Sequence, residues 1–180
     1  MSSAKFPSIP ATGLPGLALR PISLADVDSW YEYLSIPEVV EHTSWNLSGL
    51  GDLTELAQWY LSEEPGTAIR LALIEQEGNS LVGTFGYHSI SIPHKTAELA
   101  FDLNPHFWNR GIASSVCRSV TAWGFSVKEF VRIQAATLDT NRRSQRVLQK
   151  CGFEFEGKLR SYRMVRGRPG DFFMYSLLPG

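Results

Sequence analysis

The chain has 180 residues, a net charge of −1 and a pI near 6.4, and its length is that of one domain. The near-neutral charge predicts neither non-specific nucleic-acid binding nor attachment to a membrane surface. No apolar run reaches the length of a membrane span, and no apolar segment of the secretory type follows the first residues. We therefore expect a cytoplasmic protein.

The first elements predicted along the chain are an arm, a short strand and two helices. Residues 1–16 are rich in Ser, Pro and Gly and predict a flexible N-terminal arm, after which 17–180 form a single domain. A strand is expected at 17–20, and Ser23 with Asp26 has the pattern of a capping box at the start of the first helix. The loop that bears Trp45 leads to the second helix, for which Asp52 and Glu55 are the expected caps.

Strands dominate the middle of the chain. Alternating apolar residues predict strands at 69–75, 81–90 and 96–103, the last with Glu98 on its polar face. From Gly111 the apolar spacing becomes helical. The elements expected after that are a helix at 111–127, a strand at 131–138, a helix at 141–151, and strands at 153–159 and 172–178. This order predicts a mixed α/β sheet.

The junction between the 96–103 strand and the following helix carries the most informative motif, Asn109-Arg110-Gly111-Ile112-Ala113-Ser114. Small residues let a backbone approach a ligand, and the free N–H groups of a first helical turn bind anions. Arg110 would add a positive charge. The motif predicts a phosphate site, and an ordinary capped helix after a turn is the alternative interpretation.

The cysteines and histidines predict no metal site. Cys117 and Cys151 are the two cysteines, and their positions on or near apolar helix stripes indicate buried thiols rather than a disulfide. The four histidines lack the spacing of metal ligands. We expect neither a zinc site nor another bound metal.

The stretch from Glu98 through Asn104-Pro105 to Trp108 and Arg110-Gly111-Ile112-Ala113 resembles the pyrophosphate-binding motif of the GNAT N-acetyltransferases. It is most similar to their RimJ/RimL-like branch, the ribosomal-protein N-terminal acetyltransferases. Further segments follow in the family's order, so that the resemblance covers about residues 17–178. It implies a single-domain α/β fold with a mostly antiparallel sheet of about seven strands. Helices would flank this sheet, and acetyl-CoA would lie where its fourth and fifth strands splay apart.

The resemblance also implies an enzyme that transfers acetyl from acetyl-CoA directly to a primary amine. The expected acceptor is a protein N-terminal amine. A small-molecule amine (polyamine, antibiotic or amino acid) is one alternative, and a non-catalytic acyl-CoA-binding regulatory protein is another. Neither nucleic acid nor membrane is an expected partner, and the oligomeric state, a homodimer included, is left open.

Two residues are the expected catalytic groups. Glu98 matches the family's general base, although its pattern alone is also that of a solvated strand residue. Ser144 lies on the inward side of the 141–151 helix and would protonate the CoA thiolate. Many GNAT enzymes use a Tyr for this step, and Leu148 occupies its position here. A bond from Ser144 to a carbonyl of the preceding turn is the alternative. Asp102 shares the polar face with Glu98; we expect a solvated strand end there, and a second acid–base group is the alternative.

The resemblance implies acetyl-CoA contacts from a strand edge and two helix starts: Phe101, Leu103, Asn109, Arg110, Gly111, Ile112, Ala113, Ser114 and Asn141. Four aromatic residues are candidate walls of the acceptor pocket: Trp45, Phe85, Tyr87 and Tyr162. The chain departs from the family pattern at three positions. Asn109 stands where Gly is common, Trp108 where Gln or Arg is common, and Ser115 where this branch often has Glu.

Overall fold

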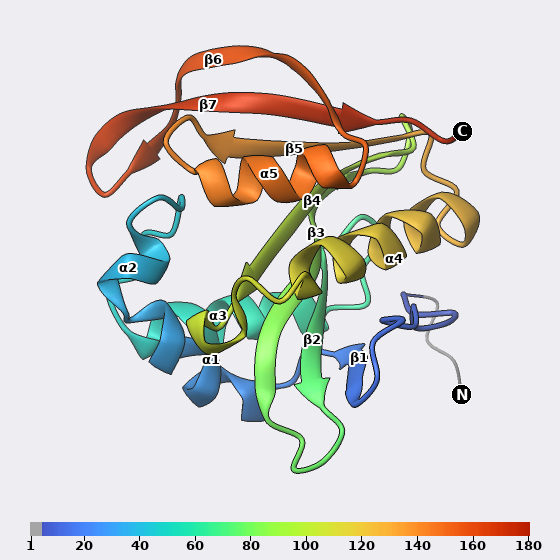
Figure 1. Cartoon of the computed structure of the whole chain (residues 1–180), viewed down its shortest axis with the longest axis vertical. Coiled ribbons are helices and arrows are strands. Elements are labelled where there is room, and N and C mark those ends of the chain that lie inside the picture. The colour runs from blue at the N-terminus through green and yellow to red at the C-terminus, as the bar shows by residue number, and fades with distance from the viewer. Residues whose placement is uncertain (1–4) are drawn as a thin grey trace.

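A seven-stranded sheet runs through the molecule in the order β1-β2-β3-β4-β5-β7-β6 (Figure 1). In this computed structural model, which describes residues 5–180, β4 and β5 are the parallel pair and all other neighbours are antiparallel. The strands are β1 (Leu17–Pro21), β2 (Ile69–Glu75), β3 (Leu81–Ser91), β4 (Thr96–Leu103), β5 (Arg132–Leu138), β6 (Glu154–Val165) and β7 (Arg168–Leu177). The predicted mixed, mostly antiparallel sheet is confirmed.

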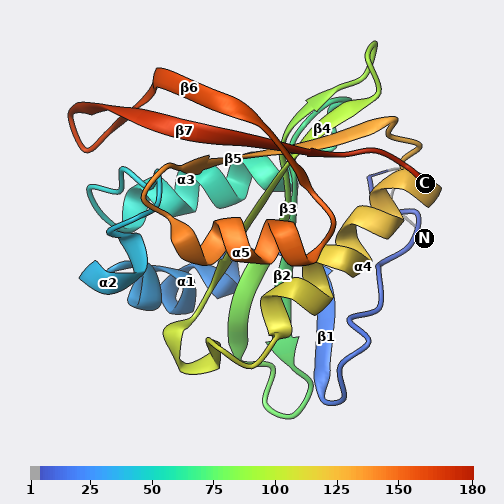
Figure 2. The ribbon, with the colours of Figure 1, turned by 45° about the horizontal axis from the view of Figure 1, so that its top comes forward.

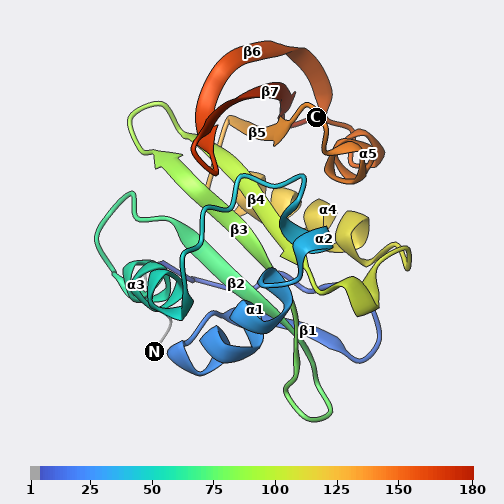
Figure 3. The ribbon, with the colours of Figure 1, turned by 90° about the vertical axis from the view of Figure 1, so that its left-hand side faces the viewer.

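Helices cover both faces of this sheet (Figure 3). They are α1 (Val27–Leu34), α2 (Pro37–Val40), α3 (Leu50–Leu61), α4 (Ile112–Ser126) and α5 (Arg142–Lys150). One hydrophobic cluster joins α4 to the sheet through Val116, Val120 and Trp123. A second cluster joins α1 and α3 to the opposite face through Trp30 and Leu53. The two clusters hold the sheet rigidly between its helices.

The capping box predicted before the first helix is confirmed. The Ser23 N–H donates to the Asp26 carboxylate over 2.8 Å, and Arg20 binds that carboxylate through both terminal nitrogens. Burial raises the pKa of Asp26, but the bonds from Arg20 and Ser23 outweigh burial and leave this pKa below its usual value. The short turn Leu24–Asp26 then leads directly into α1.

Several boundaries differ from the prediction. The hairpin of β6 and β7 is longer than predicted. Residues 160–171 are expected to form a loop, but 160–165 continue β6 and 168–171 belong to β7, so that only 166–167 form the turn. Pro169 lies in β7 beyond the last β5–β7 pair, Leu138↔Phe172, where a strand edge tolerates proline. The second helix begins at Leu50, before the expected cap Asp52, whose carboxylate accepts the Ser48 N–H.

The N-terminal segment is anchored where the structure describes it. Residues 5–16 contain no helix or strand, but Lys5 Nζ donates to the carbonyls of Tyr60 (2.6 Å) and Ser62 (2.8 Å). Ser115 Oγ donates to the Thr12 carbonyl over 3.2 Å. These bonds tie residues 5–16 to α3 and α4, so this part of the predicted flexible arm is bound to the domain. Residues 1–4 lie outside the described residues.

Gly124 in α4 tests how closely this helix packs on the sheet, and Gly51 in α3 serves as the control. A Cβ on Gly124 would lie 2.2 Å from Tyr87 Oη, which is fixed by donating to the Val120 carbonyl over 2.7 Å. We expect Gly124→Ala to lower the free energy of unfolding by ~1–3 kcal/mol, despite alanine's better helix propensity. A Cβ on Gly51 in α3 meets no atom within 4 Å, so Gly51→Ala should be neutral or slightly stabilising. Urea unfolding measures both, and equal effects would contradict the close contact.

Candidate active site

The β4–β5 pairing ends after three residue pairs. These pairs are Thr96↔Arg132, Ala97↔Ile133 and Glu98↔Gln134. Beyond them the two strands diverge, so residues 99–103 of β4 and residues 135–138 of β5 form no strand pairs with each other. Two cavities adjoin this opening, of about 280 and 340 Å³. Helices α4 and α5 lie together on one side of it (Figure 2).

The larger cavity lies between the start of α4 and α5. Asn109 (φ 61°) and Gly111 (φ 74°) both have left-handed backbone conformations, which asparagine adopts more readily than most residues other than glycine. Gly111 is the N-cap of α4, and no side chain of the described residues caps this end. A Cβ on Gly111 would meet nothing within 4 Å, so the first-turn N–H groups border open space.

Positive charge reaches this cavity from α5 rather than from the predicted residue. Arg143, Arg146 and Lys150 line the cavity, and the Arg143 guanidinium lies 4.2 Å from the centre of the Trp108 ring. Arg110, the predicted cation, is exposed, lies over the Phe107 ring at 5.4 Å and is absent from the lining. Glu38, which also lines this cavity, pairs with Arg143 over 2.9 Å. The backbone N–H groups, together with Arg146 and Lys150, therefore make this cavity suitable for a phosphate-bearing ligand.

The first turn of α5 lies where the two cavities meet. Asn141 and Ser144 line both cavities, and Asn141 Oδ1 caps the helix by accepting the Ser144 N–H over 3.1 Å. No partner for the Ser144 hydroxyl is found among residues 5–180, so the predicted alternative, a bond to the preceding turn, is not formed. Leu148 is fully buried in the core. Ser144 therefore presents a free hydroxyl at the junction.

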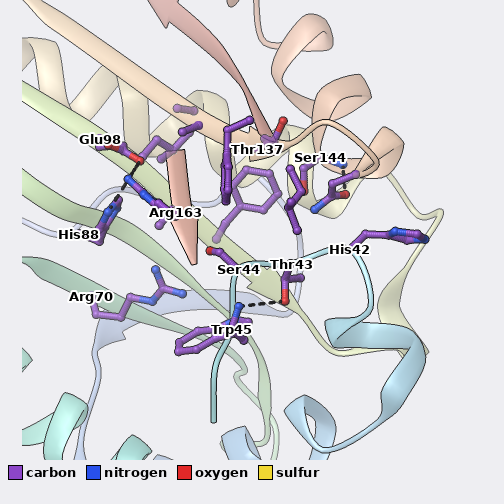
Figure 4. Close-up of a pocket in the computed structure, with 18 of the residues that line it drawn as sticks. His42, Thr43, Ser44, Trp45, Arg70, His88, Glu98, Thr137, Ser144 and Arg163 are labelled. Atoms are coloured by element: carbon purple, nitrogen blue, oxygen red, sulfur yellow. Dashed lines mark hydrogen bonds and ion pairs between the residues drawn. The ribbon is translucent and has the colours of Figure 1, made fainter. Parts of the chain in front are cut away.

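Glu98 is a buried carboxylate in the smaller cavity. Its side chain is 5% exposed, and Arg163 of β6 donates to Oε1 over 2.8 Å (Figure 4). His88 Nε2 lies 3.7 Å from the same oxygen. The described residues offer no partner to Oε2. The solvated strand position, one of the two interpretations of Glu98, is therefore wrong.

A β-bulge places His88 beside Glu98. The β3–β4 register shifts between Tyr87 and Ser89, so that His88 has no opposite residue. Bulges redirect side chains and often occur beside active sites. Burial lowers the pKa of His88; Glu98 raises it, and the charges of Arg163 and Arg70 lower it further. This net lowering keeps the imidazole neutral at neutral pH.

Asp102 is the centre of a buried network, and the expectation of a solvated strand end is wrong. Its carboxylate accepts hydrogen bonds from Arg70, Thr84, Tyr33 and Trp30. The side chain is 5% exposed, because α1 covers this face of β4. Four donors hold Asp102 in a structural role.

The four predicted aromatic walls have different positions. Trp45 lines the smaller cavity. Phe85 and Tyr87 are fully buried in the core, where no substrate reaches them, so their prediction as walls is wrong. Alternation along β3 identified their strand but not the face on which α4 packs. Tyr162 is 40% exposed and packs on Phe172 at the edge of the cavity, outside its lining.

One arginine fastens the wall that carries Trp45. Arg166, at the tip of the β6–β7 hairpin, donates to the carbonyls of Val40, Glu41, Thr43 and Trp45 over 2.9–3.2 Å. Its own N–H donates to Asn46 Oδ1. The 42–45 segment lines the smaller cavity, so the hairpin tip holds one of its walls in place.

Arg70, His88 and Arg163 are site residues that the sequence reasoning missed. Arg70 and Arg163 lie far from Glu98 in the sequence, and His88 reaches Glu98 only because of a β-bulge. No local spacing in the sequence therefore indicates these three residues. Both cysteines are buried free thiols, as predicted. Within residues 5–180, no metal-binding group of three or more His, Cys, Asp or Glu residues is found. None of the helices described there is long and apolar enough to span a membrane.

Comparison with known proteins agrees with this geometry. Residues 17–154 match the model of the acetyltransferase (GNAT) domain. The protein named uncharacterized N-acetyltransferase p20, from Bacillus licheniformis, is 32% identical over 167 residues, which cover 90% of this chain and 92% of that protein.

Two solved structures share the fold at lower identity. The ribosomal-protein-S5-alanine acetyltransferase from Vibrio fischeri has a TM-score of 0.71 at 21% identity, with 92% of this chain and 94% of that chain covered. A spermidine N-acetyltransferase from Vibrio cholerae, in complex with CoA and spermine, has a TM-score of 0.79 at 18% identity, with 92% and 96% covered. The family model and the fold agree with the resemblance to the GNAT N-acetyltransferases. The chain belongs to the GNAT acetyltransferase family and is an N-acetyltransferase.

Proposed function

We propose that this enzyme transfers acetyl from acetyl-CoA directly to a protein or peptide N-terminal amine. The observation that carries the proposal is the meeting of two cavities at Asn141 and Ser144. One cavity suits an anionic cosubstrate, and the other contains the buried carboxylate of Glu98. The test is a panel of N-terminal peptides, amino acids, polyamines and aminoglycosides, with CoA release and product mass as readouts. Transfer to no peptide N-terminus, whether or not another amine of the panel reacts, would contradict the proposal.

The larger cavity would bind acetyl-CoA. The free N–H groups at 111–114 and the cations of α5 would contact its phosphates. The β4 edge at Phe101 and Leu103 would hold the pantetheine arm in the manner of an added strand. Asn141 uses Oδ1 for its cap and keeps Nδ2 available to donate to that arm.

When bound, acetyl-CoA supplies an activated acyl carbon and a thiolate leaving group. Glu98 Oε1 is held by Arg163, while Oε2 is available to accept the amine proton, directly or through a water molecule. Ser144 would donate its proton to the departing thiolate. All these groups come from one chain, so the proposal does not require a homodimer. We place the reaction in the cytoplasm, where the free thiols Cys117 and Cys151 would remain reduced.

Gly111→Ala tests the cosubstrate site. The methyl group would project where the first-turn N–H groups meet phosphate, and loss of such charge-assisted bonds should weaken CoA binding by roughly tenfold or more. The left-handed backbone also adds ~1–2 kcal/mol of strain. Gly167→Ala is the matched control, because Gly167 has φ 78° and equally open surroundings at the hairpin tip. Calorimetric titration with CoA should show the loss in Gly111→Ala alone; equal affinities would refute the site.

Glu98→Gln tests the general base. Glutamine keeps the shape and can still accept from Arg163, so acetyl-CoA affinity should be unchanged while turnover at neutral pH falls by ~10²–10⁴-fold. Raising the pH should recover part of the activity, because an α-amino group with pKa ~7.7–8.0 then loses its proton unaided. Steady-state rates across pH measure both effects. A fall smaller than about threefold would exclude this role.

Ser144→Ala tests the proton donor. The helix cap uses the Ser144 backbone N–H and the hydroxyl has no partner among residues 5–180, so stability should not change. Single-turnover rates should fall, but by less than the ~10²–10³-fold that follows loss of an oxyanion donor, because a thiolate leaves readily. Ser126→Ala is the control: its hydroxyl donates to the Ala122 carbonyl over 2.8 Å, so stability alone should respond. Wild-type chemistry in Ser144→Ala would assign Ser144 to the scaffold.

A further inference from the structure

Arg70 is a buried cation in the wall of the smaller cavity. Its side chain is 3% exposed, and the guanidinium packs beside the rings of Trp30 and Tyr60, at 5.6 and 5.9 Å from their centres. Nε donates to Thr84 Oγ1 over 2.8 Å, and Nη2 donates to Asp102 over 2.5 Å. These contacts hold the guanidinium in one orientation.

The third nitrogen of Arg70, Nη1, has no partner among residues 5–180, and the residue lines the cavity (Figure 4). Asp102 cannot serve it, because that carboxylate already accepts from Tyr33, Trp30 and Thr84 as well as from Nη2. A buried arginine with one unused donor edge is oriented to bind an acceptor group on a ligand.

The charges of the cavity indicate the kind of ligand. Its charged lining residues are Arg70, Arg163 and Glu98, and Glu98 is already paired with Arg163. His88 is neutral, since its pKa is lowered chiefly by burial. The cavity therefore offers no free carboxylate to the second cation of a polyamine, whereas Arg70 offers two N–H donors to an anion.

We propose that Arg70 binds a carboxylate close to the acceptor amine, and that the cavity selects such amines over polyamines. The inference rests on the proposed transferase function of the same site. The carboxylate has two sources: the acidic side chain of a peptide's first residue, or the α-carboxylate of a free amino acid. Both present the same planar anion to the guanidinium fork.

The first experiment uses the wild-type protein and matched acceptors. The acceptors form three matched pairs, which are compared with spermidine. The pairs are peptides that begin with Asp or with Asn, peptides that begin with Glu or with Gln, and free amino acids or their α-amides. Hydrogen bonds to a charged group should raise kcat/KM for the carboxylate member by roughly 10- to 100-fold. The pair that shows this preference identifies the source of the carboxylate. Equal kcat/KM within every pair, or spermidine as the best acceptor, would overturn the proposal.

The second experiment removes the subsite. Arg70→Met alone would leave Asp102 charged and buried without its cation, which threatens folding. We therefore choose the double variant Arg70→Met/Asp102→Asn, with its fold and CoA affinity checked first. The carboxylate preference should disappear while amide acceptors still react. Arg168→Met, at an exposed position on β7, should keep the preference. A preference that persists in the folded double variant would overturn the proposal. Absence of CoA release with every amine would instead refute the transferase function itself.

Discussion

The short pairing between β4 and β5 is the constraint on which the rest of the structure depends. Beyond Glu98 and Gln134, β4 stays bonded to β3 while β5 stays bonded to β7, so the two halves of the sheet separate without breaking their other ladders. The inner edges of both strands become available to a ligand. Helices α4 and α5 bring their N-termini to this opening, which explains why backbone N–H groups and a serine hydroxyl meet there.

Two carboxylates on one face of β4 show how neighbouring groups determine their roles. Asp102 accepts from four donors and contributes to the packing of α1 on the sheet. In Glu98, Oε1 accepts a hydrogen bond from Arg163, whereas Oε2 has no partner among residues 5–180. Both arginines come from other strands, Arg70 from β2 and Arg163 from β6. The chemical difference between two similar strand positions therefore arises from tertiary structure.

Local signals in the sequence predict part of the local structure correctly, although the expected cap Asp52 lies inside its helix. The Ser23–Asp26 cap and the start of a helix at Gly111 both follow from short spacings. Contacts between distant strands were not predictable: Arg163 reaches Glu98 across 65 positions of the chain. The faces of β3 were also ambiguous, because period-two alternation does not say which face a helix will cover. For that reason the alternation along β3 does not reveal that Tyr87 lies in the core rather than in the wall of a cavity.

The attachment made by Arg166 has an evolutionary consequence. Its guanidinium binds four main-chain carbonyls of the 40–45 segment, and main-chain carbonyls are present whatever the side chains are. Substitutions at Thr43 or Trp45 can therefore change the surface of the smaller cavity without loosening the segment from the hairpin. A fastening that is independent of side-chain identity leaves the chemical character of this wall free to change, while β4, β5 and the opening between them keep their geometry.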